Sequence, residues 1–297
     1  MGDLYHIDKT RVRKSFSRAA KSYDAAAIVQ KLVREEMLSR LDLVKIQPRT
    51  ILDAGCGTGL ASHALQKRFK QTQVVSLDFA YEMLQQTRKA SMLQSITNLF
   101  SRSSHRVLCA DIEALPLANA SIGLVWSNLA IQWCNDLDLA FQEFHRVLQP
   151  EGLLMFSTFG PDTLRELRVA TSSATGNLNT SVNRFIDMHD IGDALVRAGF
   201  NAPVLDVERY TLTYDDVKSV MRDLKSIGAH NATDGRARGL LGRGFLQKLE
   251  ASYEQFRANG KLPATFEVVY GHAWRAADKP NLGMDISPIE FRPRKQL

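Results

Sequence analysis

Apolar runs and amphipathic segments alternate along the chain between residues 50 and 158. Short apolar runs predict strands, and longer segments with apolar residues three and four positions apart predict helices. Such alternation is typical of βαβ units, in which helices cover both faces of a parallel sheet. The predicted strands are residues 50–54, 73–78, 106–110, 122–128 and 153–158, and the helices between them are residues 60–70, 80–90 and 137–148.

The pattern changes on both sides of this core. A helix is predicted before it, at residues 26–43. After it come helices at 163–169 and 191–198, a strand at 204–213, a helix at 217–227, a basic glycine-rich stretch at 228–244, a helix to about 258 and a last strand at 266–274. A strand that follows so long an insertion suits an antiparallel edge. We therefore predict an α/β fold with a doubly wound, mostly parallel sheet of seven strands.

Composition narrows the class of protein. The 297 residues suffice for one large α/β domain with insertions, and the net charge of +6 favours an acidic partner. No apolar run approaches the roughly 18 residues of a membrane span, and the N-terminus lacks a secretory signal pattern. The cysteines Cys56, Cys109 and Cys134 form no C-x-x-C pair, which indicates reduced thiols and a cytoplasmic location. With no apolar run long enough to span a bilayer, no membrane partner is expected.

The turn after the first core strand carries the strongest chemical signal. It places Asp53 before three glycines at every second position, Gly55, Gly57 and Gly59. A glycine-rich turn between a strand and a helix makes a nucleotide-binding crevice. Leu60 stands where a dinucleotide fingerprint needs a small residue, and no Lys or Arg lies between residues 50 and 66 to complete a phosphate-binding P-loop. The remaining pattern, D-x-G-x-G-x-G, resembles motif I of class I S-adenosylmethionine (AdoMet) methyltransferases, which have a Rossmann-like fold.

Acidic and polar residues at the ends of the other strands fit that ligand. Asp78 ends the second strand, where a carboxylate accepts from ribose hydroxyls or caps the next helix. Asp111 suits the adenine amino group or an exposed turn, and Asn128 lies at the expected crevice mouth. Phe79 and Met83 fit the adenine and the core equally well. The predicted AdoMet-binding residues are Asp53, Gly55, Gly57, Gly59, Asp78, Phe79, Met83, Asp111, Ile112 and Asn128.

Four further segments point to a particular family. Residues 15–24 read S-F-S-R-A-A-K-S-Y-D, residues 111–117 read D-I-E-A-L-P-L, residues 126–134 read W-S-N-L-A-I-Q-W-C and residues 221–229 read M-R-D-L-K-S-I-G-A. Together with the glycine-rich turn, they resemble the malonyl-[acyl-carrier protein] O-methyltransferases of biotin synthesis. The resemblance covers most of positions 10 to 275.

The resemblance implies an activity. It is methyl transfer from AdoMet to the free carboxylate of malonyl-acyl carrier protein, or of malonyl-CoA, which leaves S-adenosylhomocysteine and a methyl ester that primes pimelate synthesis. A malonyl carboxylate is ionised at pH 7 and needs no general base or metal. Tyr23 and Asn128 are the candidate catalytic residues, and Tyr23 lies in an N-terminal box that is expected to close over the cofactor.

The same resemblance implies an organisation and a partner. We expect a helical lid at 1–45, the AdoMet-binding core at 46–160, a helical insertion at 161–203, C-terminal strands with a basic cap at 204–276 and a disordered tail at 277–297. Residues 218–248 carry a net charge of +5, which suits an acidic acyl carrier protein. The candidate residues for substrate and carrier are Phe16, Arg18, Trp133, Arg222 and Lys225, of which Trp133 also fits a core anchor and the charged residues a solvated helix face.

Alternatives remain at this point. Residues 228–231 (G-A-H-N) and 271–274 (G-H-A-W) also resemble respiratory complex I assembly factors, which bind AdoMet and are thought to hydroxylate a protein arginine. An AdoMet-binding protein without enzymatic activity is a third class. Methylation of nucleic-acid bases is disfavoured, because residues 127–130 read S-N-L-A instead of the expected N-P-P-Y/F tetrad, so no nucleic-acid partner is expected.

Overall fold

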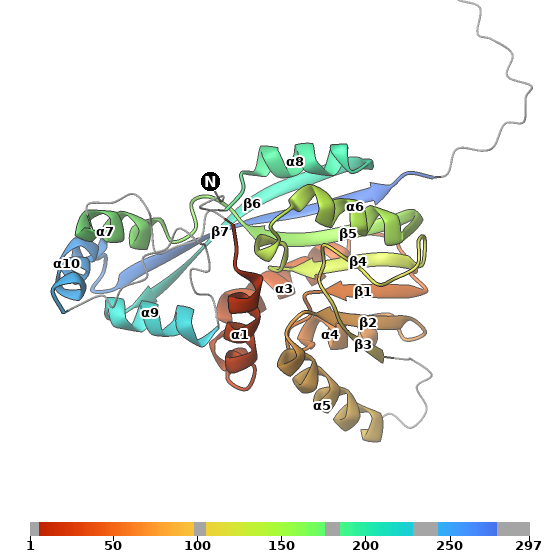
Figure 1. The fold of residues 1–297 in the computed structure, drawn as a ribbon, viewed down its shortest axis with the longest axis horizontal. Coiled ribbons are helices and arrows are strands. Elements are labelled where there is room, and N and C mark those ends of the chain that lie inside the picture. The colour runs from red at the N-terminus through yellow and green to blue at the C-terminus, as the bar shows by residue number, and fades with distance from the viewer. Residues whose placement is uncertain (1–5, 98–104, 176–184, 228–242, 278–297) are drawn as a thin grey trace, which may run out of the picture.

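The computed structural model describes residues 6–97, 105–175, 185–227 and 243–277. Its centre is one sheet of seven strands in the order β3-β2-β1-β4-β5-β7-β6 (Figure 1). The strands are β1 (Thr50–Ala54), β2 (Gln73–Asp78), β3 (His105–Cys109), β4 (Ile122–Asn128), β5 (Leu148–Phe159), β6 (Phe200–Tyr214) and β7 (Leu262–Arg275). The first five pair in parallel, whereas β7 is antiparallel to both β5 and β6. The predicted doubly wound, mostly parallel sheet is confirmed, and its last strand is antiparallel as expected. The prediction that this strand forms the edge is wrong, because β6 pairs along its outer side and places β7 between β5 and β6.

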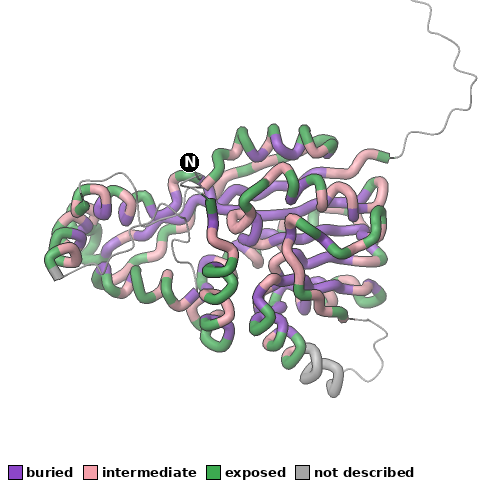
Figure 2. The backbone as a smooth tube through the Cα atoms, in the orientation of Figure 1, coloured by how far each residue is buried: buried purple, intermediate pink, exposed green. Residues whose placement is uncertain are grey.

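Helices cover both faces of this sheet. They are α1 (Lys9–Ala19), α2 (Tyr23–Ala26), α3 (Ile28–Leu41), α4 (Leu60–Arg68), α5 (Tyr81–Thr97), α6 (Leu137–Val147), α7 (Arg165–Thr175), α8 (Met188–Arg197), α9 (Val217–Ser226) and α10 (Arg243–Tyr253). Buried residues of α3 and α4 pack on one face, and those of α6 and α8 pack on the other. Neighbouring residues of β1 therefore both face apolar cores: Ile51 packs with the first set and Leu52 with the second. The central strands appear as buried tube in Figure 2.

The antiparallel pair is longer than the sequence pattern predicts. β6 begins at Phe200 and β7 at Leu262, four residues before each predicted start. The first half of β7 pairs only with β6, so the two strands extend past β5 toward α7, α9 and α10 (Figure 1). Exposed and half-buried residues alternate along β6, which is an edge strand, so its ends lack the apolar run by which a buried strand is predicted.

The N-terminal segment forms more helices than predicted. The predicted helix at 26–43 corresponds to α3, and two helices that the pattern does not predict, α1 and α2, precede it. α1 contacts α5, and α2 contacts α9. The predicted boundaries between lid, core, insertion and cap stay a prediction. The basic stretch at 228–244 and the tail at 277–297 fall almost entirely outside the described residues. Within the described ranges, no helix is long and apolar enough to cross a membrane.

Candidate active site

The glycine-rich turn connects β1 to α4 at the carboxyl ends of the parallel strands. Gly55, Gly57 and Gly59 have φ values of +78°, +55° and +84°, which L side chains rarely adopt. A Cβ on Gly55 would lie 2.2 Å from the Cβ of Ala130, and one on Gly59 would lie 2.5 Å from the Thr87 Cγ2. A Cβ on Gly57 would reach only the ring of Tyr23, at 4.0 Å. Gly55 and Gly59 therefore permit tight packing, whereas Gly57 leaves its backbone open to a ligand.

Asp78 connects the end of β2 to that turn. One carboxylate oxygen accepts from the Gly57 N–H at 2.9 Å, and the other accepts from the Ala80 N–H at 2.8 Å. Burial raises the pKa of Asp78 to about 6, against the opposing effect of these backbone donors. Asp78 thus caps the segment that leads into α5 and also fixes the turn. The carboxylate has more lone pairs than these bonds use, so it retains the capacity to accept from ribose hydroxyls as predicted.

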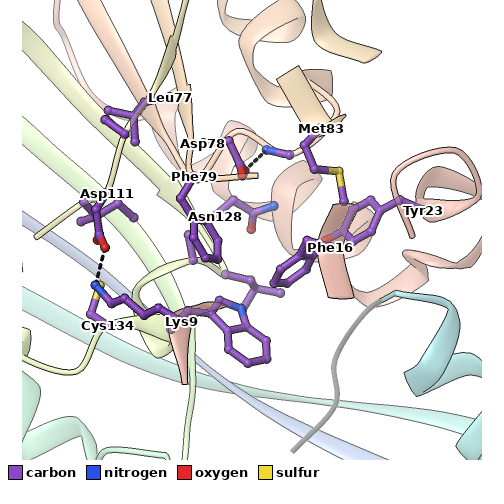
Figure 3. A pocket seen from close by; sticks show the side chains of 17 residues that line it. Lys9, Phe16, Tyr23, Leu77, Asp78, Phe79, Met83, Asp111, Asn128 and Cys134 are labelled. Atoms are coloured by element: carbon purple, nitrogen blue, oxygen red, sulfur yellow. Dashed lines mark hydrogen bonds and ion pairs between the residues drawn. The ribbon is translucent and has the colours of Figure 1, made fainter. Parts of the chain in front are cut away.

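Most of the predicted cofactor residues line one cavity of about 630 Å³ (Figure 3). The turn, the ends of β2 and β4, the segment after β3 and the N-terminal helices all contribute to it. The predicted residues that it brings together are Phe16, Tyr23, Gly55, Gly57, Asp78, Phe79, Met83, Asp111, Ile112, Asn128 and Trp133. Lys9 and Cys134 also line this cavity. Cys134 ends the quoted segment 126–134 but is not among the predicted site residues, and Lys9 belongs to no quoted motif.

Lys9 ties the N-terminal helix to the loop after β3. Its Nζ lies 2.6 Å from an oxygen of Asp111 (Figure 3). It also forms an ion pair with Glu113. Beside it, the amide side chain of Asn135 pairs with both backbone groups of Ile7, at 2.7 and 3.1 Å. The partners are more than 100 residues apart in the chain, so no local sequence pattern could reveal them. The Asp111 carboxylate predicted for adenine is thereby also an anchor of α1.

Aromatic rings close the same cavity. Phe16 of α1 packs edge-on against Trp133, with ring centroids 5.4 Å apart and an interplanar angle of 88°. Its centroid also lies 6.3 Å from the rings of Tyr23 and Phe79. These distances are typical of stabilising aromatic pairs. Three segments that are distant in sequence therefore form one apolar wall, which limits access of water to the cavity.

A second cavity of about 560 Å³ lies on the other side of the turn and shares Tyr23, Gly55, Gly57 and Asn128 with the first. Asp53 lines it, and so do the cationic residues Lys31 and Arg34 of α3. Sequence reasoning missed these two residues. The available signal was helical spacing, because positions 27, 30, 31 and 34 of this helix recur on one face and all line the cavity.

Asp53 and Tyr23 are both protonated more readily in this environment than in water. Burial raises the pKa of Asp53 to about 7, and the charge of Asp78 adds to that effect, whereas hydrogen bonds from Ser62 and the charge of Arg34 oppose it. Burial, followed by the charges of Asp78 and Asp24, raises the pKa of the Tyr23 hydroxyl above its ordinary value. Tyr23 therefore remains a hydrogen-bond donor at neutral pH.

Asn128 is held from two sides. Its Nδ2 donates to the backbone carbonyl of Gln30 at 3.1 Å, and its Oδ1 accepts from the Ser157 hydroxyl at 3.0 Å. These bonds tie α3 to the ends of β4 and β5, so a positioning role is already visible. One N–H and one lone pair remain for a ligand, and the predicted catalytic role of Asn128 stays a prediction.

The remaining predicted residues lie outside both cavities. Gly59 is the N-cap of α4 and ends the glycine-rich turn. Arg18, Arg222 and Lys225 are exposed and line neither cavity, so a direct contact with the reacting groups would require a change in conformation. No cluster of metal-ligating side chains occurs among the residues that the structure describes.

Comparison with known proteins identifies the family of the protein that carries this site. Residues 52–156 match the family described as "Methyltransferase domain". The malonyl-[acyl-carrier protein] O-methyltransferase of Methylovorus sp. (strain MP688) is 65% identical over 98% of this chain and 97% of its own length. The enzyme of the same name from Laribacter hongkongensis is 54% identical over 99% of both chains. This chain belongs to the malonyl-[acyl-carrier protein] O-methyltransferase family.

Solved structures support the fold of this O-methyltransferase at low sequence identity. The YcgJ protein from Bacillus subtilis superposes with a TM-score of 0.55, at 12% identity over 82% of this chain and 98% of its own. The [4+2]-cyclase SpnF gives a TM-score of 0.51 at 18% identity, over 84% and 82% of the two chains. These likenesses show a shared fold alone.

The cofactor of this methyltransferase is AdoMet, and the two cavities fit it. The open backbone at Gly57 and the carboxylates of Asp53 and Asp78 suit a ligand that carries an ammonium, a sulfonium and a ribose diol. Arg34 and Lys31 could receive its carboxylate in the second cavity. The aromatic wall of the first cavity suits adenine and a positively charged sulfur.

Proposed function

We propose that the chain transfers a methyl group from AdoMet to the free carboxylate of a malonyl group on acyl carrier protein, in the cytoplasm. The relatives that share its full length carry this activity in their names. The observation that carries the proposal is the aromatic wall of Phe16, Tyr23, Phe79 and Trp133, which lines the cavity beside the glycine-rich turn and Asp78. The full-length relatives favour this activity over arginine hydroxylation and over cofactor binding alone.

The reaction needs alignment more than acid–base chemistry. When bound, AdoMet supplies a methyl group that is activated by a positively charged sulfur. A malonyl carboxylate is ionised at neutral pH, so its oxygen is a competent nucleophile without a base. Exclusion of water by the aromatic wall strengthens the attraction of opposite charges and weakens the hydration of this carboxylate. Holding the two groups in line then supplies much of the rate enhancement.

Tyr23 is the residue best placed to hold the carboxylate. Its ring lines both cavities, and its hydroxyl remains protonated because burial and two nearby aspartates raise its pKa. A neutral hydrogen-bond donor can orient a carboxylate and, unlike Lys or Arg, does not hold it in a strong ion pair. The ester product has no charge, so this contact weakens after transfer and favours release.

We further propose that an acidic carrier protein docks against α9. This helix exposes Arg222 and Lys225 and contacts α2, the helix that begins with Tyr23. Lys218 of the same helix already pairs with Glu250 at 3.2 Å, so it contributes less free charge than the sequence count suggests. Arg18 is exposed on α1, which extends this basic surface along the lid. A carrier bound there would bring its phosphopantetheine arm toward the aromatic wall.

The decisive assay offers malonyl-acyl carrier protein and AdoMet with a radiolabelled methyl group to the purified chain. We expect label on the malonyl group that is released by mild base, as for a methyl ester. Acetyl-acyl carrier protein is the matched control, because it lacks the free carboxylate and should remain unlabelled. Folded protein that binds AdoMet but labels neither carrier, or labels both equally, would contradict the proposed acceptor. Malonyl-CoA in a parallel reaction measures how much the carrier contributes.

A further inference from the structure

A chain of buried polar side chains runs under the glycine-rich turn, across three adjacent strands. The Ser62 hydroxyl of α4 lies 2.5 Å from a carboxylate oxygen of Asp53 on β1 and 2.5 Å from the Ser76 hydroxyl on β2. Ser76 in turn lies 2.6 Å from the Nε2 atom of His105 on the edge strand β3. Asp53, Ser62 and Ser76 are at most 1% exposed. This chain of hydrogen bonds therefore connects the turn to the nearer edge of the sheet, at β3, through buried groups.

When Asp53 is ionised, the number of protons available fixes which group donates in each of these hydrogen bonds. A serine hydroxyl has a single proton, and Ser62 donates its proton to the carboxylate. Ser76 must then donate to Ser62, and the Nε2–H of His105 must donate to Ser76. Every donor points toward Asp53, and each hydrogen bond polarises the next one in the same sense. When Asp53 is protonated, its carboxyl group can donate as well as accept, so this single direction is no longer imposed.

We propose that Ser62, Ser76 and His105 are positioning residues that hold the Asp53 carboxylate in its ionised, cofactor-binding state. Asp53 lines the second cavity, where an anion attracts the positively charged AdoMet. The hydrogen bonds from Ser62 to the opposite side of the carboxylate fix its orientation without occupying the cavity. This inference rests on AdoMet binding and does not depend on the methyl acceptor.

Other charged and titratable groups lie near the two ends of this series of hydrogen bonds. At the Asp53 end, Asp78 disfavours the ionised carboxylate and Arg34 favours it, while the buried thiol of Cys56 lies close by. At the other end, the ring of His63 packs against His105 with centroids 5.5 Å apart.

Neither ring nitrogen of His63 has a hydrogen-bond partner within the described part of the chain. Burial and then His63 lower the pKa of His105 to about 4, and burial and then Lys67 lower that of His63. Both histidines are therefore neutral at pH 7, and His105 has one ring proton to give. The ionisation that matters near neutral pH is consequently that of Asp53, whose pKa burial raises to about 7.

These hydrogen bonds should affect how the affinity for AdoMet depends on pH. Protonation of Asp53 removes an attractive charge, so the affinity for AdoMet falls as the pH falls through the pKa of this group, by up to about tenfold per pH unit. Loss of a donor in the chain destabilises the ionised form, so the midpoint of that fall moves to higher pH. We expect a rise of about half a pH unit, because the effect reaches Asp53 through one or two intervening hydroxyls.

The test is isothermal titration calorimetry with AdoMet from pH 5.5 to 8.5, in buffers of different ionisation enthalpy. Wild-type protein should release a proton on binding near pH 6.5. Ser76→Ala and His105→Phe should raise the midpoint, whereas His105→Gln, whose amide can still donate to Ser76, should keep the wild-type value. The control Ser127→Ala removes a buried hydroxyl that donates to the Ala54 carbonyl at 3.0 Å, outside the chain, and should leave the midpoint unchanged.

Folded Ser76→Ala and His105→Phe proteins with the wild-type midpoint would overturn the proposal, and so would binding without proton release. If Ser76→Ala does not fold, the pair of His105 variants decides, because His105 is only half-buried on an edge strand. Methyl transfer is not part of this measurement. A wrong assignment of the acceptor would therefore leave its outcome unchanged and would be detected only in the carrier assay.

Discussion

Tyr23 is the residue at which binding and catalysis should separate. Tyr23→Phe keeps the ring that packs against Phe16 and lines both cavities, and removes only the hydroxyl. We expect turnover to fall by about 10- to 100-fold, in the range of one lost hydrogen bond to a charged group. The dissociation constant for AdoMet should change by less than about threefold. Equal losses of turnover and affinity, measured by the carrier assay and by calorimetry, would make Tyr23 a packing residue instead.

Asp53 should make the cofactor-free protein less stable as the pH rises. Its folded pKa of about 7 lies above the value of about 3.9 for an unfolded chain. Between these two values the folded state binds more protons, so the free energy of unfolding decreases as pH increases. Asp53→Asn removes this contribution. We expect the variant to gain about 2 kcal/mol relative to wild type between pH 5 and pH 8 in urea unfolding.

The opposite sign, or a constant difference between the two proteins, would contradict the raised pKa of Asp53. The same substitution should weaken AdoMet binding by more than about tenfold at pH 8, because the buried negative charge is lost. Stability and cofactor affinity would then change in opposite directions. That combination identifies a group whose burial is unfavourable for folding and useful for binding.

Among the elements, α1 is held beside the cavity by ion pairs of a single residue, Lys9. Lys9→Met keeps most of the aliphatic stem and removes the ion pairs with Asp111 and Glu113. We expect AdoMet to dissociate about three- to tenfold faster in stopped-flow measurements, since these partly buried ion pairs no longer oppose movement of α1 away from the cavity. Lys14→Met is the matched control on an exposed position of the same helix. An unchanged dissociation rate for Lys9→Met would show that the aromatic contacts of Phe16 alone hold α1.

The elements also show which parts of the site the sequence could predict. Asp53, Asp78 and Asp111 were predictable because parallel strands bring their carboxyl ends to one edge of the sheet. The contact between Lys9 and Asp111 depends on where α1 folds back, and no local periodicity encodes that. Ser76 and His105 meet through the register of β2 and β3, which the apolar pattern of buried strands does not reveal.

Edge positions limited the fold prediction in the same way. The core strands β1, β2 and β4 agree with their predicted bounds, because both faces of each are buried and read as apolar runs. β6 has one neighbour and a partly exposed surface, so its first residues were assigned to the preceding insertion. Fold class therefore followed from the buried strands, and the lengths of β6 and β7 had to come from their pairing.

At the scale of the whole molecule, the distribution of charge matters more than the net value of +6. Arg222 and Lys225 lie on α9 beside the helix that begins with Tyr23, whereas Lys45 and Lys70 precede β1 and β2, at the opposite end of the parallel strands. The first pair should increase the association rate of an acidic carrier protein, and the second pair should have little effect on it. Guidance of this kind acts mainly on the association rate and is screened by salt.

The double variant Arg222→Glu/Lys225→Glu tests that guidance. We expect kcat/KM for malonyl-acyl carrier protein to fall by about tenfold at low salt, and its dependence on salt to weaken, because favourable long-range charges have become repulsive. Lys45→Glu/Lys70→Glu changes the net charge equally and should retain most of the activity. Malonyl-CoA separates docking from chemistry, since it lacks the carrier's surface and should be affected little by either variant. If both doubles lose the same activity, net charge rather than a docking surface on α9 governs encounter; if malonyl-CoA turnover falls in parallel with carrier turnover, α9 acts on the reacting groups instead.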